Sequence, residues 1–283
     1  MKSCLVTSLV LSVLLILQTR VVHAETAEEY FAAGKTALAK ADFRGALRAF
    51  ANAARADRDN QEYLQQFAMV RQVIVLRQRL DTEPDDAKWE YMARGLHSFY
   101  ISNGLLPEAL PLDEAMHERL NTTFSATTLA ETQLALQMHN EAAQTLAGLA
   151  PEKQTATTRA LHGLALARRG EVEQARRVAA AIELPEDASP GTFYSVARLN
   201  AAIGDTDQSL AFLARCFESL APSRQDAFKD HAKTSPEFAS FVSTKAFTQA
   251  IETKSKVHES ACSGGSRCGS CPMRGQCSGS SGN

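Results

Sequence analysis

The sequence predicts an all-α protein built from a repeated helical hairpin. Apolar residues recur at steps of three and four along most of the chain, which is the spacing of one helix face. Alanine is abundant in the chain, and tryptophan occurs once. Small residues open the second helix of successive hairpins at Ala109, Ala142, Ala175 and Ser209, and these positions differ by 33, 33 and 34. Such a period indicates hairpins that bury their apolar faces only against neighbouring copies.

The clearest hairpin covers residues 191–220, and Gly204-Asp205 divides it into two helices. Glycine accepts a positive φ and aspartate caps the helix that follows, so this pair predicts a tight turn. Ala197 and Cys216 are small residues at positions where the two helices must approach closely. We expect Cys216 to pack as a buried small side chain, because free cysteine packs well in cores.

Residues 25–60 repeat this pattern and carry a resemblance to a known family. They match the tetratricopeptide repeat, a 34-residue helix–turn–helix unit, at Tyr30, Ala33, Gly34, Ala37, Asp42, Phe43, Ala46, Phe50 and Ala53. The resemblance extends over about residues 27–220, and Gly163 also occupies a position where the family prefers glycine. It implies a right-handed superhelical solenoid that serves as a protein-interaction scaffold and has no catalysis of its own.

The other hairpins are predicted in residues 85–222. Their paired helices are expected at 89–102 with 105–120, 127–138 with 141–149, and 159–168 with 173–182. The middle pair is expected to turn at His139-Asn140. Residues 61–84 hold an apolar helix without a partner of its own, which is an orphan helix or a degenerate repeat. Ala46 and Ala175 are expected at helix crossings, and Arg168 on an exposed face.

Residues 223–254 predict a helical cap of one short and one longer helix. The last repeat of such an array needs a cap because its apolar flank is otherwise exposed. The apolar residues that would form this cap are Phe228, Phe238, Phe241, Phe247 and Ile251.

Residues 1–24 predict a secretory signal peptide that is cleaved near Ala24. Lys2 supplies the positive charge, and an apolar run from Leu5 to Leu17 follows it. A membrane-spanning helix needs about 20 apolar residues, and Gln18 interrupts this run too early. The mature chain is therefore expected to be exported to the periplasm or secreted, without an integral membrane segment.

The tail, residues 255–283, is rich in Gly, Ser and Cys and has few residues that could form a core. Ordering its cysteine segment costs on the order of 16–30 kcal/mol of backbone entropy. Zinc held by four thiolates would offset about 10–16 kcal/mol, and disulfides about 2–4 kcal/mol each. Export favours two disulfides, while zinc binding and reactive free thiols remain alternatives. The cysteines concerned are Cys262, Cys268, Cys271 and Cys277.

No sequence pattern predicts an enzyme: the chain lacks GxSxG, P-loop and GxGxxG motifs. Its formal net charge of -2 does not favour nucleic-acid binding. The histidines are scattered, and we expect His97, His117, His139 and His162 to be ordinary surface or crossing residues. The favoured function is binding of a protein or peptide partner. The alternative is a metal-binding or thiol-redox protein that acts through the tail while the helical array docks it.

A partner is expected in a groove formed by the first helices of the hairpins. The side chains there are mixed, and they do not form the Lys–Asn–Arg clamp with which many tetratricopeptide proteins hold a terminal carboxylate. The candidate groove residues are Phe31, Lys35, Arg94, Glu131, Tyr194 and Arg198.

Overall fold

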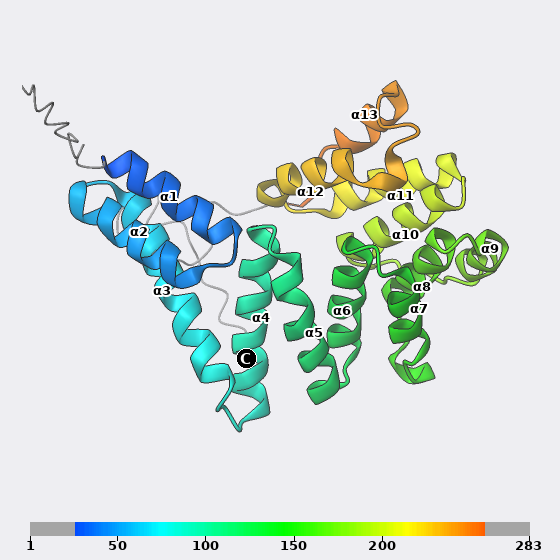
Figure 1. The fold of residues 1–283 in the computed structure, drawn as a ribbon. Helices are drawn as coiled ribbons and strands as arrows, with labels where there is room; N and C mark the ends of the chain where they lie inside the picture. Colours follow the sequence, from blue (N-terminus) through cyan, green and yellow to red (C-terminus); the bar gives the residue numbers. More distant parts are fainter. Residues whose placement is uncertain (1–25, 258–283) are drawn as a thin grey trace, which may run out of the picture. The chain divides into compact units, whose positions relative to one another are not determined.

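The computed structural model describes residues 26–257, which form thirteen α-helices and two short 3₁₀ helices and no strand (Figure 1). The all-α prediction is therefore confirmed for this part of the chain. The chain divides within α3 into two compact units: unit 1 ends at Val75 and unit 2 begins at Leu76. The predicted signal peptide and the four tail cysteines lie outside the described residues.

Unit 1 contains α1 (Ala27–Ala39), α2 (Phe43–Ala56) and most of α3 (Gln61–Leu80). A capping box starts α1: the Thr26 hydroxyl accepts from the Glu29 amide at 3.2 Å, and the Glu29 carboxylate accepts from the Thr26 amide at 2.7 Å. Such reciprocal bonds satisfy two of the amide groups that a helix start leaves without partners. Asp42 caps α2 with a single bond, accepting from the Gly45 amide at 2.8 Å.

An aromatic cluster holds unit 1 together. The Phe31 ring lies 5.5 Å from Phe50 and 4.6 Å from Tyr63 of α3, measured between ring centroids. Gly34 lets α1 and α2 approach closely, since a Cβ there would lie 2.5 Å from the Phe50 ring. The helix that was expected to lack a partner of its own contacts α1 in its first turn through Tyr63.

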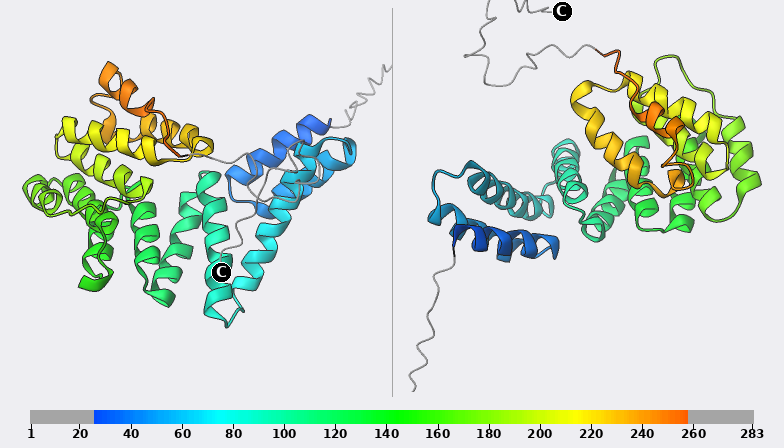
Figure 2. Two further views of the ribbon diagram at one scale, coloured as in Figure 1. Left: turned by 180° about the vertical axis from the view of Figure 1, so that it is seen from behind. Right: turned by 90° about the horizontal axis from the view of Figure 1, so that it is seen from above.

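Unit 2 continues with hairpins in which each helix from α4 to α11 packs on the next one. The left view of Figure 2 shows the green helices of this unit side by side in chain order. The helices are α4 (Asp86–Ser102), α5 (Leu106–Leu120), α6 (Thr123–Ala135), α7 (His139–Ala147), η1 (Pro151–Lys153), α8 (Ala156–Arg168), α9 (Val172–Ala180), α10 (Pro190–Ala202) and α11 (Thr206–Ser219).

The turns of these hairpins repeat with the period that the sequence predicts. Each has one residue with positive φ, at Gly104 (69°), Gln137 (62°), Gly170 (86°) and Gly204 (84°), and these positions again differ by 33, 33 and 34. The same backbone hydrogen bond also closes each turn. The amide of the residue after the positive-φ residue donates to the carbonyl of the residue four positions before the positive-φ residue. Its N···O distances are 2.8, 2.8, 2.9 and 2.9 Å. Ala41 and Asp42 make the equivalent turn in unit 1, with a bond of 3.0 Å.

The small residues of the predicted register occupy the helix crossings. Ala46, Ala109, Ala142, Ala175 and Ser209 are all fully buried. Gly163 serves the same purpose on α8, because a Cβ there would lie 2.9 Å from Leu199. These residues are small because the opposing helix leaves no room for a larger side chain.

One predicted turn is misplaced. The chain turns at Leu136–Met138, with Gln137 in the left-handed region, and His139 already belongs to α7. The sequence offers no glycine at this turn, so its position follows only from the period. The preceding helix also begins earlier than expected, because Thr122 caps it by accepting from the Ser125 amide at 3.1 Å.

The cap consists of α12 (Pro222–Thr234), η2 (Pro236–Phe238) and α13 (Lys245–Ile251). This part of the chain thus holds one longer and one short α-helix, with the longer one first. Fully buried Phe238 and nearly fully buried Phe247 lie in one apolar cluster with Leu213 and Phe217 of α11. The cap thus covers the apolar flank of the last hairpin.

Candidate functional site

A cavity of about 470 Å³ lies in unit 2. Among residues 26–257, it is lined by the first helices of three successive hairpins and by the first helix of the cap. Its walls are formed by Thr127 and Glu131 of α6, Thr157 of α8, Ser189, Gly191, Thr192, Tyr194, Ser195 and Arg198 at α10, and Ala227, Phe228 and His231 of α12. Three residues predicted for the groove, Glu131, Tyr194 and Arg198, therefore come together.

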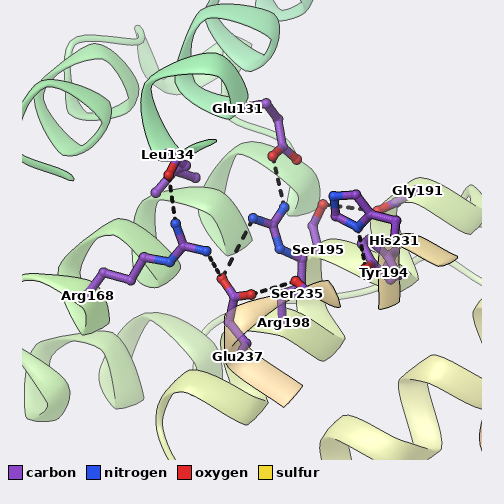
Figure 3. Close-up of polar contacts among 10 residues, drawn as sticks. All are labelled: Glu131, Leu134, Arg168, Gly191, Tyr194, Ser195, Arg198, His231, Ser235 and Glu237. Atoms are coloured by element: carbon purple, nitrogen blue, oxygen red, sulfur yellow. Dashed lines mark hydrogen bonds and ion pairs between the residues drawn. The ribbon is translucent and has the colours of Figure 1, made fainter. Parts of the chain in front are cut away.

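Arg198 is the central charge of the site. Its guanidinium lies between two carboxylates (Figure 3): Nη1 donates to Glu131 Oε2 at 2.8 Å, and Nη2 lies 3.7 Å from Glu237 Oε1. The residue is only 5% exposed. A buried guanidinium is tolerated where carboxylates compensate its charge, and here two of them do so.

Glu237 extends this pair into a chain of alternating charges. Its carboxylate accepts from Arg168 Nη2 and, at 2.7 Å, from the Ser235 hydroxyl (Figure 3). Arg168 also donates to the Leu134 carbonyl at 2.8 Å. The expectation that Arg168 lies on an exposed face is therefore wrong: its side chain is 15% exposed and bridges α6, α8 and η2. The charged end of a long side chain can point inward when a buried group of opposite charge pairs with it. The spacing of residues along a helix does not reveal such a pairing.

Electrostatics keep this network ionised. Burial alone would raise the pKa of Glu237, but Arg198, Arg168 and the Ser235 hydroxyl hold that pKa below its usual value. For Arg198 the signs are reversed. Burial alone would lower its pKa, but the nearby carboxylates of Glu131 and Glu237 raise that pKa above its usual value. Two positive and two negative charges therefore face one another, and the network as a whole is neutral.

Another part of the cavity lining is aromatic. The Tyr194 hydroxyl lies 2.5 Å from His231 Nδ1, and the Tyr194 ring meets Phe228 edge to face at 5.5 Å between centroids. Burial raises the pKa of Tyr194, helped by nearby Glu237, and burial also lowers the pKa of His231. Both side chains are thus neutral near pH 7.

The cavity lining also includes a chain of hydroxyl groups. Thr192 Oγ1 lies 2.9 Å from Ser189 Oγ and 2.8 Å from Thr157 Oγ1. The Ser189 hydroxyl also caps α10 by accepting from the Thr192 amide at 3.1 Å. The floor of the cavity therefore offers neutral hydrogen-bonding groups.

The other predicted groove residues lie elsewhere. Phe31 is buried in the core of unit 1, and Lys35 lies over its ring at 4.4 Å. Arg94 on α4 pairs with Glu90 at 2.5 Å and stacks over Phe124 at 3.6 Å. None of these three lines the cavity described above.

A larger hollow of about 700 Å³ lies beside α9, α10 and the turn at Gly204. Its arginine, Arg176, already donates to the Ile203 carbonyl at 3.0 Å. It is formed around one hairpin and its neighbouring helix, so it does not combine successive first helices as the smaller cavity does. We therefore place the candidate site at the smaller cavity.

One of the four scattered histidines, His97, pairs with a buried carboxylate of the next helix. His97 Nδ1 lies 2.8 Å from Asp113 Oδ1, and the Thr132 hydroxyl donates to Asp113 Oδ2 at 2.6 Å. Asp113 is fully buried, so this carboxylate depends on these two partners. Asp113 stands 16 residues after His97 on the next helix, and no short motif connects them.

Cys216 is buried, as predicted, and burial raises its thiol pKa to about 12. Among residues 26–257, no three His, Cys, Asp or Glu side chains converge to hold a metal ion. Within the same range no helix combines the length and the hydropathy needed to cross a bilayer.

Comparison of the sequence with models of known protein families finds no match, and a search of curated proteins finds no significant relative.

Proposed function

We propose that this chain is an exported interaction scaffold of tetratricopeptide-like repeats, arranged as a right-handed solenoid, and that it binds a peptide segment of a protein partner. The proposed binding site is the cavity lined by α6, α8, α10 and α12. One observation carries the proposal: this cavity is built from the first helices of consecutive hairpins, whose turns recur with a nearly constant period. Stacked helical hairpins commonly present such a surface to extended ligands.

The proposal also agrees with the chemistry of the walls. Small-molecule and peptide sites combine apolar or aromatic surface with a few oriented polar groups, and here Phe228 and Tyr194 line the same cavity as Glu131 and the hydroxyl chain. The hydroxyl that lies beside a base in this cavity is that of Tyr194, 2.5 Å from His231 Nδ1. Burial raises its pKa, so it keeps its proton, and binding is a better account of the cavity than catalysis.

The proposal is tested by selecting ligands from a displayed library of random peptides on the full-length chain. Binding of a selected peptide is then measured by fluorescence anisotropy with two matched variants. Ala227→Trp places a large ring at the cavity mouth, because Ala227 is exposed and lines the cavity. Ala87→Trp makes the same change at an exposed helical alanine outside it.

We expect Ala227→Trp to weaken binding at least about tenfold, the loss of roughly 1.4 kcal/mol, and Ala87→Trp to leave it unchanged. A library that yields no binder, or a binder that Ala227→Trp does not affect, would refute the proposed site.

A further inference from the structure

We propose that the cavity of α6, α8, α10 and α12 recognises an uncharged peptide amide with an apolar side chain, and that it discriminates against a carboxylate. This inference depends on the proposed function and adds the chemical class of the ligand. It follows from which polar groups of the cavity are already engaged and which remain open.

The arginine of the site is not available to an incoming anion. Its Nη1 is taken up by Glu131, and its Nη2 faces Glu237. Its Nε has no hydrogen-bond partner but is buried below 1 Å² of accessible surface. A ligand carboxylate would therefore meet little of the positive charge of Arg198.

Glu131 is more exposed to a ligand than Arg198, its partner in the ion pair. Its side chain is 40% exposed and lines the cavity, and only its Oε2 is engaged by Arg198. Oε1 can accept a hydrogen bond from a ligand N–H group. A second carboxylate at this place would be repelled, and like charges placed together across an interface are strongly unfavourable.

The other walls supply donors without charge. Tyr194 keeps its phenolic hydrogen, so we assign it as the donor to His231 Nδ1, which puts the imidazole hydrogen on Nε2. His231 is exposed at the cavity, so this N–H is open to a ligand carbonyl.

The hydroxyl chain provides a second donor. Ser189, Thr192 and Thr157 have three hydroxyl hydrogens, and the two hydrogen bonds among these residues use two of them. One hydroxyl hydrogen of this chain is therefore left for an acceptor on the ligand. An amide presents both the N–H that Glu131 accepts and the carbonyl oxygen that these donors require, and it adds no charge to a neutral site.

The aromatic wall selects the side chain. Phe228 is half-buried and meets Tyr194 edge to face. Its remaining exposed surface is apolar, and an aromatic or aliphatic ligand side chain would cover it. Burial of that surface gives roughly 25 cal/mol per Å².

The test compares three probes that share one side chain: N-acetylphenylalaninamide, which is neutral, N-acetylphenylalanine, which carries a carboxylate, and phenylalaninamide, which carries an ammonium group. Their dissociation constants for the full-length chain are measured by titration followed by ¹H–¹⁵N NMR. We expect the neutral probe to bind about tenfold more tightly than the carboxylate probe, and also more tightly than the ammonium probe. We expect Ala227→Trp to abolish the shifts.

Glu131→Gln removes the exposed charge while keeping the shape of the side chain. It should raise the affinity of the carboxylate probe several-fold relative to the neutral one. Glu186→Gln makes the same change in charge at an exposed glutamate that does not line the cavity, and should leave the ratio unchanged. The ratio in the unmodified chain decides the question even if Glu131→Gln impairs folding.

The inference is overturned if the carboxylate or ammonium probe binds as tightly as the neutral one, if Glu131→Gln leaves the ratio unchanged in a folded protein, or if the neutral probe does not bind. The proposed function fails separately. If a library peptide still binds in a manner that Ala227→Trp blocks, then only the preference for an uncharged amide is wrong.

Discussion

Arg168→Ala should destabilise unit 2 far more than Arg169→Ala, although the two arginines are adjacent in the sequence. The Arg168 side chain is 15% exposed and donates both to the Leu134 carbonyl and to Glu237, whose side chain is 2% exposed. Arg169 is 33% exposed and pairs with the similarly exposed Glu171 at 2.8 Å. The two substitutions remove the same side chain from different electrostatic surroundings.

The expected difference follows from burial. Removing one partner of a buried ion pair costs roughly 3–5 kcal/mol, because it leaves a charge without compensation. Glu237 keeps Arg198 at 3.7 Å and the Ser235 hydroxyl at 2.7 Å, so we expect Arg168→Ala to lower the free energy of unfolding by about 2–4 kcal/mol. An exposed pair contributes about 0–1 kcal/mol, which sets the expectation for Arg169→Ala.

The assay is urea denaturation of the full-length chain followed by tryptophan fluorescence. The single tryptophan, Trp89, lies in α4 and therefore reports on unit 2. A difference between the two variants of less than about 1 kcal/mol would refute the argument, because Arg168 would then act as an ordinary surface residue.

The pH dependence of stability provides a second measure of the same network. The arginines hold the pKa of Glu237 below its usual value of 4.5 despite burial. Its stabilising contribution is therefore complete above about pH 4.5, the value in the unfolded chain, and is lost as the pH falls toward the lower pKa of the folded state. Glu237→Gln should remove this dependence, so its unfolding free energy should fall less steeply below pH 4.5 than that of the unmodified chain. Identical slopes would show that Glu237 does not titrate as a paired carboxylate.

Three further expectations concern the packing and the buried polar groups. Ala175→Phe should cost roughly 1–3 kcal/mol or more by overpacking a fully buried crossing, whereas the same change at exposed Ala180 should cost less than about 0.5 kcal/mol; equal melting temperatures would contradict this. His97→Ala should lower the free energy of unfolding in urea by about 2–4 kcal/mol, but by much less when Asp113→Asn has already removed the buried charge. If the losses of the two single variants add up in the double variant, His97 and Asp113 are not coupled. Cys216 should resist iodoacetamide in the native chain at pH 8 and react once urea unfolds it, as followed by peptide mass spectrometry, because its pKa is raised to about 12; rapid native labelling would be inconsistent with its burial.

The repeat register could be predicted from the sequence because packing restricts it strongly. A helix crossing accepts only a small side chain, so Ala109, Ala142, Ala175 and Ser209 mark the period in the sequence itself. The turns were predictable where glycine supplies the positive φ, as at Gly204. Gln137 takes the same conformation without being glycine, and local composition therefore placed that turn a few residues too late.

The candidate site could be predicted only in part. Glu131, Tyr194 and Arg198 were proposed from their positions on the first helices of hairpins, and all three line the cavity. Glu237 and His231 were missed, because they belong to the cap and have no place in the repeat. They meet Arg168 and Tyr194 across 69 and 37 residues of sequence. No local spacing reports contacts over such separations.

The cap therefore has two structural roles that arise from the same contacts. The flank of the last hairpin is apolar at Leu213 and Phe217, and Phe238 covers these side chains. The same flank is charged at Arg198, and a carboxylate compensates that charge. Glu237 directly precedes Phe238 in η2, so one short segment supplies both the apolar and the anionic partner. The preceding α12 adds Phe228 and His231 to the cavity that Arg198 also lines. Any change that displaces the cap should consequently expose the core, leave Arg198 with a single carboxylate and open one wall of the binding site, so that stability and ligand binding decline together.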